Sequence, residues 1–175
     1  MTLTDLVVIH CAPTLADIKC SSLVCLGSLD SYDAEELGVL RRKGLSFRFL
    51  RNRKGCPLLF LYREKRLEAV ISGEASPLLR ALGYDTSSVA LSLDRLGERM
   101  VEDDFPHEIG IFLDYPLEDV RSFVENRGEN FILSGVWKVY HNPERAERTF
   151  KRYSECTRCL LSRYEKCREL YRLCV

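Results

Sequence analysis

The chain has 175 residues, of which 46% are hydrophobic and 30% are charged, a composition typical of a soluble globular protein. Its 26 Lys and Arg residues balance its 26 Asp and Glu residues, so no net charge draws it to nucleic acid or to an anionic membrane. No apolar run approaches the roughly 18–20 residues that cross a bilayer. The N-terminal segment lacks the basic start of a secretory signal. We therefore expect one cytoplasmic domain over residues 1–175.

The N-terminal third of the chain alternates short apolar runs with turn residues. Apolar residues predict a short helix over 3–11, and Pro13 is expected to begin a second one that reaches Lys19, because proline suits the first helical turn. Residues 23–26 read as a buried strand. Ser31 or Asp33 is the predicted N-cap of a helix over 34–43, which Gly44 ends.

The middle of the chain predicts a hairpin followed by helices. Alternating apolar and basic residues over 45–49, a turn over 52–57 and an apolar run over 58–62 are typical of a β-hairpin with a basic outer face. Short helices are predicted over 63–71 and 77–82, and a longer one over 87–100.

The C-terminal half begins with an αα corner. Pro106 and Pro116 mark the starts of predicted helices over 107–114 and 116–126, and residues 131–140 are predicted to form the last strand. Asn142 and Pro143 start a long helix that is predicted to run over 143–172. The whole pattern predicts a compact, mainly helical α+β fold with a small sheet of about four antiparallel or mixed strands.

Three motifs carry a family resemblance. They are His10–Ala16 (HCAPTLA), Phe105–Gly110 (FPHEIG) and Gly135–Tyr140 (GVWKVY). In this order and spacing the chain, over about residues 1–160, resembles a family of small proteins of unknown function from anaerobic Gram-positive bacteria. The resemblance implies a bacterial cytosolic protein encoded near iron-uptake or flavodoxin genes, and it brings no established activity. Asp17 and Asp114 stand where the resemblance leads us to expect glycine.

Eight cysteines stand at irregular positions: Cys11, Cys20, Cys25, Cys56, Cys156, Cys159, Cys167 and Cys174. A disulfide scaffold is usually a small, secreted, loop-rich chain, which this one is not, so we expect reduced thiols. Such cysteine usage in a cytosolic protein also indicates an anaerobic host.

Cys11 is the strongest candidate nucleophile in the sequence. It precedes the predicted helix start at Pro13, and a thiol at a helix N-terminus has its pKa lowered by the backbone donors there. His107 as a base and Glu108 as its orienting partner would complete a cysteine-dependent enzyme. In the alternative interpretation Cys11 is a small buried residue, and His107 with Glu108 caps a helix.

The same residues suggest a metal site, which is the leading hypothesis. His10, Cys11, His107 and Glu108 offer nitrogen, sulfur and oxygen ligands that suit zinc or iron, and a haem is a further candidate. The protein would then act in iron or redox metabolism. Neither adjacent pair has the spacing of a preformed site, so the ligands must be brought together by the fold.

A ligand-binding role is predicted for Thr14, Trp137, Lys138 and Tyr140. If Lys138 faces a pocket with His107 and Glu108, its ammonium would bind an anionic substrate or cofactor group; an exposed lysine on a strand is the ordinary alternative. Whether the protein is an enzyme stays open at this stage.

The last helix and the hairpin suggest a third function, that of a noncatalytic interaction module. On a continuous helix Cys156, Cys167 and Cys174 share a stripe, which indicates a packing or oligomer face. The CxxC formed by Cys156 and Cys159 lacks the second pair that a structural zinc site needs. Basic residues over 41–54 and 144–172 could contact single-stranded nucleic acid, but the acidic helix 116–126 is a poor DNA reader, so nucleic acid is not expected.

Overall fold

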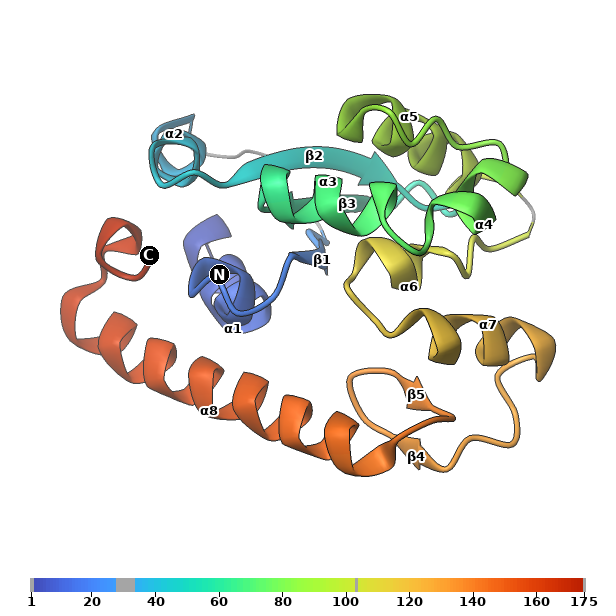
Figure 1. The fold of residues 1–175 in the computed structure, drawn as a ribbon. Coiled ribbons are helices and arrows are strands. Elements are labelled where there is room, and N and C mark those ends of the chain that lie inside the picture. The colour runs from blue at the N-terminus through green and yellow to red at the C-terminus, as the bar shows by residue number, and fades with distance from the viewer. Residues whose placement is uncertain (1, 28–33, 103, 175) are drawn as a thin grey trace.

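A three-stranded sheet lies between two groups of helices in the computed structural model, which describes residues 2–27, 34–102 and 104–174 (Figure 1). The sheet consists of β1 (Ser21–Cys25), β2 (Ser46–Arg51) and β3 (Pro57–Tyr62), antiparallel in the order β1-β3-β2. The predicted mainly helical α+β fold is confirmed. Within the described ranges, no helix combines the length and apolarity that a membrane crossing requires.

The central strand β3 divides the interior into two hydrophobic cores. Successive side chains of a strand point to opposite faces of the sheet. Leu59 and Leu61 therefore join the core around helix α1 (Leu3–Leu15), whereas Leu58, Phe60 and Tyr62 join a second core. The second core is built with α3 (Glu64–Ser72), α4 (Ser76–Ala81), α5 (Val89–Arg99), α6 (Ile109–Phe112) and α7 (Leu117–Glu125).

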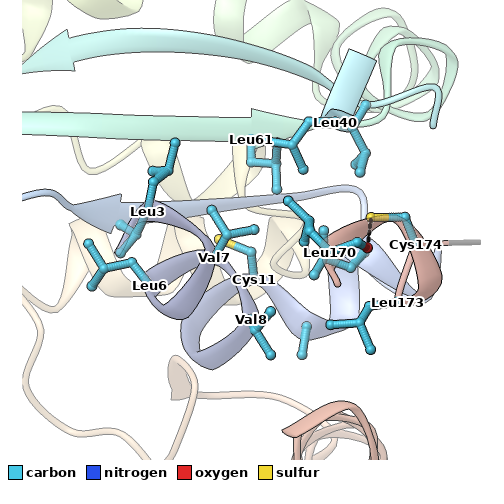
Figure 2. Close-up of a cluster of buried hydrophobic side chains, with 14 of the residues drawn as sticks. Leu3, Leu6, Val7, Val8, Cys11, Leu40, Leu61, Leu170, Leu173 and Cys174 are labelled. Atoms are coloured by element: carbon cyan, nitrogen blue, oxygen red, sulfur yellow. Dashed lines mark hydrogen bonds between the residues drawn. The ribbon is translucent and has the colours of Figure 1, made fainter. Parts of the chain in front are cut away.

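Helix α1 is the centre of the first core. It is buried on nearly all sides because it lies between the sheet and the long helix α8 (Pro143–Cys167), and Figure 2 shows its apolar side chains directed at both. Thr2 and Asp5 form a capping box at its start, and the Tyr164 hydroxyl of α8 donates to Asp5 over 2.9 Å. The hydrogen bond from the Thr2 backbone is the largest of the effects that lower the pKa of Asp5.

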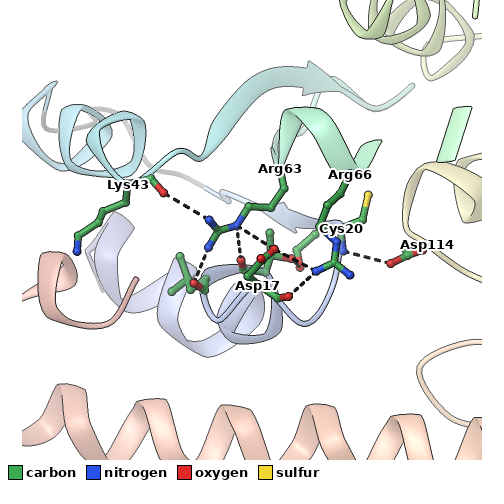
Figure 3. Close-up of polar contacts among 9 residues, drawn as sticks. Asp17, Cys20, Lys43, Arg63, Arg66 and Asp114 are labelled. Carbon is green, nitrogen blue, oxygen red and sulfur yellow. Dashed lines mark hydrogen bonds and ion pairs between the residues drawn. The ribbon is translucent and has the colours of Figure 1, made fainter. Parts of the chain in front are cut away.

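The predicted helix start at Pro13 is wrong, because Pro13 lies inside the last turn of α1. The proline has no N–H for the Ile9 carbonyl one turn earlier, so α1 lacks one backbone hydrogen bond in its last turn. The carbonyl groups that the helix end leaves without intrahelical partners are bound by Arg63, whose guanidinium donates to Thr14 O at 3.2 Å and to Leu15 O at 2.8 Å (Figure 3).

Asp17 and Asp114, the positions where glycine was expected, both adopt left-handed backbone conformations, with φ of 54° and 64°. Aspartate tolerates this region better than most residues. Both carboxylates also make polar contacts. Asp17 forms an ion pair with Arg66 at 3.0 Å, and Asp114 accepts a hydrogen bond from the Cys20 amide at 3.2 Å (Figure 3). The turns that the resemblance indicated are therefore present, with aspartate in place of glycine.

Most predicted elements of the first hundred residues are confirmed within a few residues. The hairpin is β2 and β3, and α2 (Ala34–Arg42), α3, α4 and α5 occupy the predicted places. Ser88 caps α5 by accepting from the Leu91 amide. The predicted caps Ser31 and Asp33 lie outside the described residues.

The predicted strand over 131–140 is wrong in its extent. The chain reverses around Gly135, whose amide donates to the Trp137 carbonyl, so that only β4 (Leu133–Ser134) and β5 (Lys138–Val139) pair. This small hairpin forms a sheet of its own beside α7 and the start of α8 (Figure 1).

The last helix is shorter than predicted. It ends at Cys167, because Arg168 adopts a left-handed conformation with φ of 53° and the chain turns back through η1 (Leu170–Arg172). Leu170, Leu173 and Cys174 then enter the α1 core (Figure 2), against which Cys156 and Cys167 also pack. The cysteine stripe therefore packs as predicted, although not on one continuous helix, and Cys159 is exposed.

Candidate functional site

Several predicted site residues from the corner and from the GVWKVY motif meet in one pocket. It has a volume of about 170 Å³ and lies between α6, α7 and β5. We call it the aromatic pocket, and its lining residues are Phe105, His107, Ile109, Gly110, Tyr115, Asp119, Val120, Phe123, Trp137 and Lys138.

The αα corner forms one wall of the pocket. Helices α6 and α7 pack closely because Gly110 has no side chain; a Cβ at that position would lie 2.8 Å from the Val120 Cγ2 atom and 3.2 Å from the Tyr115 ring. Asp114, in its left-handed conformation, turns the chain between the two helices. The close packing places Tyr115 and Phe123 on the same pocket.

Asp119 fixes the opposite wall. Asp119 is only 2% exposed, and its carboxylate accepts three hydrogen bonds from the segment around β5. The donors are the Trp137 indole N–H at 2.8 Å and the backbone amides of Tyr140 and His141 at 2.9 Å each. Hydrogen bonds to a buried charge are the stronger ones, so this single side chain of α7 holds β5 in place.

The Trp137 ring lies between other aromatic side chains. Tyr115 stacks on it with centroids 5.2 Å apart, and Phe150 of α8 meets it edge to face at 4.6 Å. Gly135 makes room for Phe150, because a Cβ there would lie 2.2 Å from that ring. The orientation of the indole is therefore determined by packing as well as by Asp119.

Lys138 supplies the positive charge of the pocket. Its ammonium donates to the Gly128 carbonyl at 2.6 Å and lies 4.6 Å from the centroid of the Phe131 ring. An ammonium has three N–H donors, so the bond to Gly128 leaves capacity for an acidic group of a ligand. The side chain is half-buried, which weakens the competition from water.

His107 lies exposed at the edge of the pocket. Its ring is 5.4 Å from the Phe105 centroid and 5.0 Å from the Phe123 centroid. The imidazole therefore extends the aromatic wall outward and can still donate or accept a hydrogen bond with a ligand.

Glu108 points away from its neighbour His107. It is buried and accepts from the Tyr84 hydroxyl at 2.8 Å and from the Arg99 guanidinium at 2.9 Å. Burial and the adjacent carboxylate raise the pKa of Tyr84, and the hydrogen bond with Glu108 raises the pKa of Arg99. In this geometry Glu108 joins α5 to the start of α6, and its hydrogen-bond partners are Tyr84 and Arg99 instead of His107.

Most residues of the HCAPTLA motif are buried at or beside the α1 core. Cys11 is fully buried in the middle of α1, and burial raises the pKa of its thiol to about 12, which is the opposite of the predicted activation. Thr14 is buried and hydrogen-bonds Ser22 at 2.9 Å, whereas His10 is exposed. Within the described part of the chain, no three His, Cys, Asp or Glu side chains gather in a way that could hold a metal ion.

Lys19 adds a second buried cation near the site. It is 7% exposed, and its ammonium lies 5.3 Å from the centroid of Tyr115, a wall of the aromatic pocket, and 5.8 Å from that of Tyr153. Burial lowers the pKa of Lys19. Its charge adds to the positive potential that Lys138 creates around the aromatic walls.

Two further pockets adjoin the aromatic one. A polar pocket of about 220 Å³ shares Asp119 and Trp137 with it and is bordered by Arg145 and Arg152 of α8. An apolar pocket of about 280 Å³ shares Phe105, His107 and Val120 with it. A ligand larger than a single ring could therefore extend past His107 into the apolar pocket.

Three lining residues of the aromatic pocket are not among the predicted site residues: Tyr115, Asp119 and Phe123. Tyr115 follows the predicted turn and Phe123 lies within the predicted second helix, but neither carries a local signal of pocket position. Asp119 is one of several acidic residues of that helix. Its burial against the β5 segment depends on a contact between residues 18–22 positions apart in the chain.

The fold and the pocket define a mainly helical α+β protein with an aromatic-walled site and a lysine at its margin. Residues 7–174 match the family model of a protein of unknown function, DUF3793. The match covers nearly the whole chain, so the protein belongs to the DUF3793 family. No match was found among curated proteins or among solved structures.

Proposed function

We propose that the protein binds a small planar organic acid in the aromatic pocket. The observation that carries the proposal is the meeting of Trp137, Tyr115 and Phe123 with the ammonium of Lys138 in one concave site. Apolar pockets with a few placed polar groups are the usual form of small-molecule sites.

The walls favour a flat ring. Aromatic side chains attract another ring in stacked or edge-to-face arrangements, worth about 0.5–1.5 kcal/mol beyond the buried area. A cavity of about 150 Å³ is known to hold benzene, and the aromatic pocket measures about 170 Å³. A single six-membered ring is therefore the size of ligand that the pocket suits.

The charge favours an acid. Lys138 is the cation among the pocket's lining residues, and His107 adds a polar ring at the edge. The carboxylate of Asp119 is already bound by three donors, so it opposes an anionic ligand less than a solvated carboxylate would. A carboxylate on the ring would accept from Lys138 in a charge-assisted hydrogen bond.

The geometry supports binding better than the metal or cysteine-enzyme hypotheses. Those hypotheses need Cys11 to lie near His107 and Glu108, but Cys11 belongs to the α1 core, while Ile109, next to Glu108, belongs to the second core. The roles predicted for His10, Cys11 and Glu108 stay predictions, and the proposal uses His107, Trp137 and Lys138.

The test uses the single tryptophan of the chain as a reporter. Single-ring acids, with benzoate as the first probe, are titrated against the protein while Trp137 emission and ligand-observed NMR are recorded. Matched neutral and cationic rings, benzamide and benzylamine, are titrated in parallel. We expect the acids to bind more tightly and to change the emission.

Lys138→Gln tests the role of the charge. It removes the charge and leaves a polar side chain that is one atom shorter, and the loss of a charged hydrogen bond of about 1.5–3 kcal/mol should weaken binding of the acids by about tenfold or more. Lys65→Gln is the matched control, because Lys65 is exposed on α3. Equal binding of acids and neutral rings, or equal effects of the two substitutions, would contradict the proposal.

A further inference from the structure

Two cysteines that are far apart in the sequence lie side by side at one end of the three-stranded sheet. The Sγ atoms of Cys25, at the end of β1, and Cys56, just before β3, are 2.7 Å apart. Cys25 is exposed and Cys56 is half-buried, so both are within reach of small reagents. The pair is separate from the residues of the aromatic pocket.

The register of the sheet explains why the two thiols meet. Cys25 is paired with Leu58, and Cys56 stands two residues before Leu58, so alternation along the strand places both cysteines on the same face. The side chain of Asn52 accepts from the Cys56 amide at 2.9 Å, which fixes the loop that carries Cys56. The juxtaposition is therefore a consequence of strand pairing and of an ordered turn.

The surroundings of Cys25 favour a reactive thiolate. A hydrogen bond from the Cys56 thiol, followed by one from the backbone of Gly27, lowers the pKa of Cys25. By contrast, burial raises the pKa of Cys11 and of Cys20, to about 12 in each case.

We propose that Cys25 and Cys56 form a dithiol site that reacts reversibly with small-molecule disulfides. The Cys25 thiolate attacks one sulfur of the disulfide RSSR, forms a mixed disulfide and releases one thiolate, RS⁻. Cys56 then loses its proton to solvent, attacks the Cys25 sulfur and releases the second thiolate. Both released thiolates are protonated, so the protein loses two electrons and two protons, and RSSR is reduced to two RSH.

Cys156 and Cys159 of α8 are the other pair of neighbouring cysteines that could react with a disulfide. Cys156 packs against the α1 core, its thiol contacts the Ala12 carbonyl at 3.7 Å, and burial raises its pKa. Cys159 is exposed but lies on the same continuous helix. The proposal therefore ranks Cys25 above Cys159 in reactivity, and the comparison is part of the test.

The experiment treats the reduced full-length protein with hydroxyethyl disulfide, an uncharged small disulfide. The reaction is quenched with N-ethylmaleimide at intervals, and the products are mapped by peptide mass spectrometry. We expect the Cys25–Cys56 bond to be the first intramolecular disulfide, with the other cysteines alkylated, and dithiothreitol to restore the dithiol. A first disulfide between any other cysteines, or mixed disulfides that never close, would overturn the proposal.

Three variants assign the two steps. Cys56→Ser should stop at a mixed disulfide on Cys25, and Cys25→Ser should leave Cys56 reacting about tenfold more slowly or worse, because the better nucleophile is gone. Cys159→Ser is the matched control and should leave the rate and product unchanged. Equal rates in the two pair variants, or slower closure in the control, would argue against the site, and the wild-type peptide map decides the matter independently of any effect on folding.

Discussion

Substitution of Asp119 tests how the aromatic pocket is held together. The carboxylate accepts from the Trp137 indole and from the backbone amides of Tyr140 and His141, and it is almost fully buried. Asp119→Ala removes all three acceptor contacts. Asp119→Asn keeps the shape and can still accept both backbone amides, but its NH₂ group faces the indole N–H, so one hydrogen bond becomes a donor–donor contact.

The expected losses follow from this count. An unsatisfied donor costs about 1–3 kcal/mol, and these donors are only partly buried, so the low end applies. We expect Asp119→Ala to lower the free energy of unfolding by about 3 kcal/mol and Asp119→Asn by about 1–2 kcal/mol. Against a typical total of about 5–15 kcal/mol, both changes are measurable.

Urea unfolding followed by far-ultraviolet circular dichroism measures these losses without relying on tryptophan emission. A double-mutant cycle with Trp137→Phe isolates the indole bond, because Asp119→Asn has no N–H to oppose when the indole is absent. We expect a coupling of about 1 kcal/mol in the cycle. Glu118→Gln, an exposed neighbour on α7, is the control and should change stability by less than about 0.5 kcal/mol.

Two results would refute the reasoning about Asp119. If Asp119→Asn and Asp119→Ala are equally destabilising, the retained amide contacts do not matter. If the coupling with Trp137 is indistinguishable from zero, the carboxylate does not hold the indole, and the pocket wall must be fixed by packing alone.

Two further substitutions test the supports of the fold and of the pocket. Asp5→Asn should lower the free energy of unfolding by about 1 kcal/mol at neutral pH. Because folding lowers the pKa of Asp5, the stabilisation by its carboxylate is complete above the unfolded value of 3.8 and is lost as the pH falls through the lower folded value. The urea midpoints of variant and wild type should therefore converge in acid, and a constant difference would contradict this. Gly135→Ala should displace the Phe150 ring and cost about 1–3 kcal/mol with a changed near-ultraviolet dichroism of Trp137. Gly38→Ala is its control, because only the end of the flexible Arg42 side chain is near a Cβ at that position. It should stabilise α2 by up to about 1 kcal/mol. Equal effects of the two glycine substitutions would contradict the close contact between Gly135 and Phe150.

The two proposed sites can be judged separately. Ligand binding depends on Lys138 and the aromatic walls of the second half of the chain, whereas disulfide exchange depends on the end of β1 and the hairpin loop. Failure of benzoate and its relatives to bind would leave the reactivity of Cys25 untouched, and the reverse also holds.

Local patterns were sufficient for most of the elements. Periodicity, prolines and capping residues predicted the hairpin, the helices over the first hundred residues and the αα corner, because these signals act between residues a few positions apart. They also failed locally. Pro13 is a predicted helix start but lies in the last turn of α1, and residues 131–140 are a predicted single strand although the chain reverses at Gly135.

Only part of the candidate site could be predicted from the sequence, because local patterns do not report contacts between distant residues. The GVWKVY and FPHEIG motifs supplied Trp137, Lys138 and His107, and the structure brings these three together. Glu108 is adjacent to His107 in the sequence, but consecutive side chains diverge, and its partners Tyr84 and Arg99 come from elsewhere in the second half of the fold. Only residue chemistry, and no spacing, links Cys11 to these two residues.

Local spacing and composition were enough to predict the fold class, the order of most elements and the residue types available for chemistry. Which of those residues meet depends on contacts between distant parts of the chain. Strand register brought Cys25 to Cys56 across 31 positions, one buried carboxylate drew the Trp137 segment onto α7, and the alternation of β3 put Cys11 and the corner into different cores. Such contacts depend on the packing of many residues along the whole chain, so no single sequence motif predicts them.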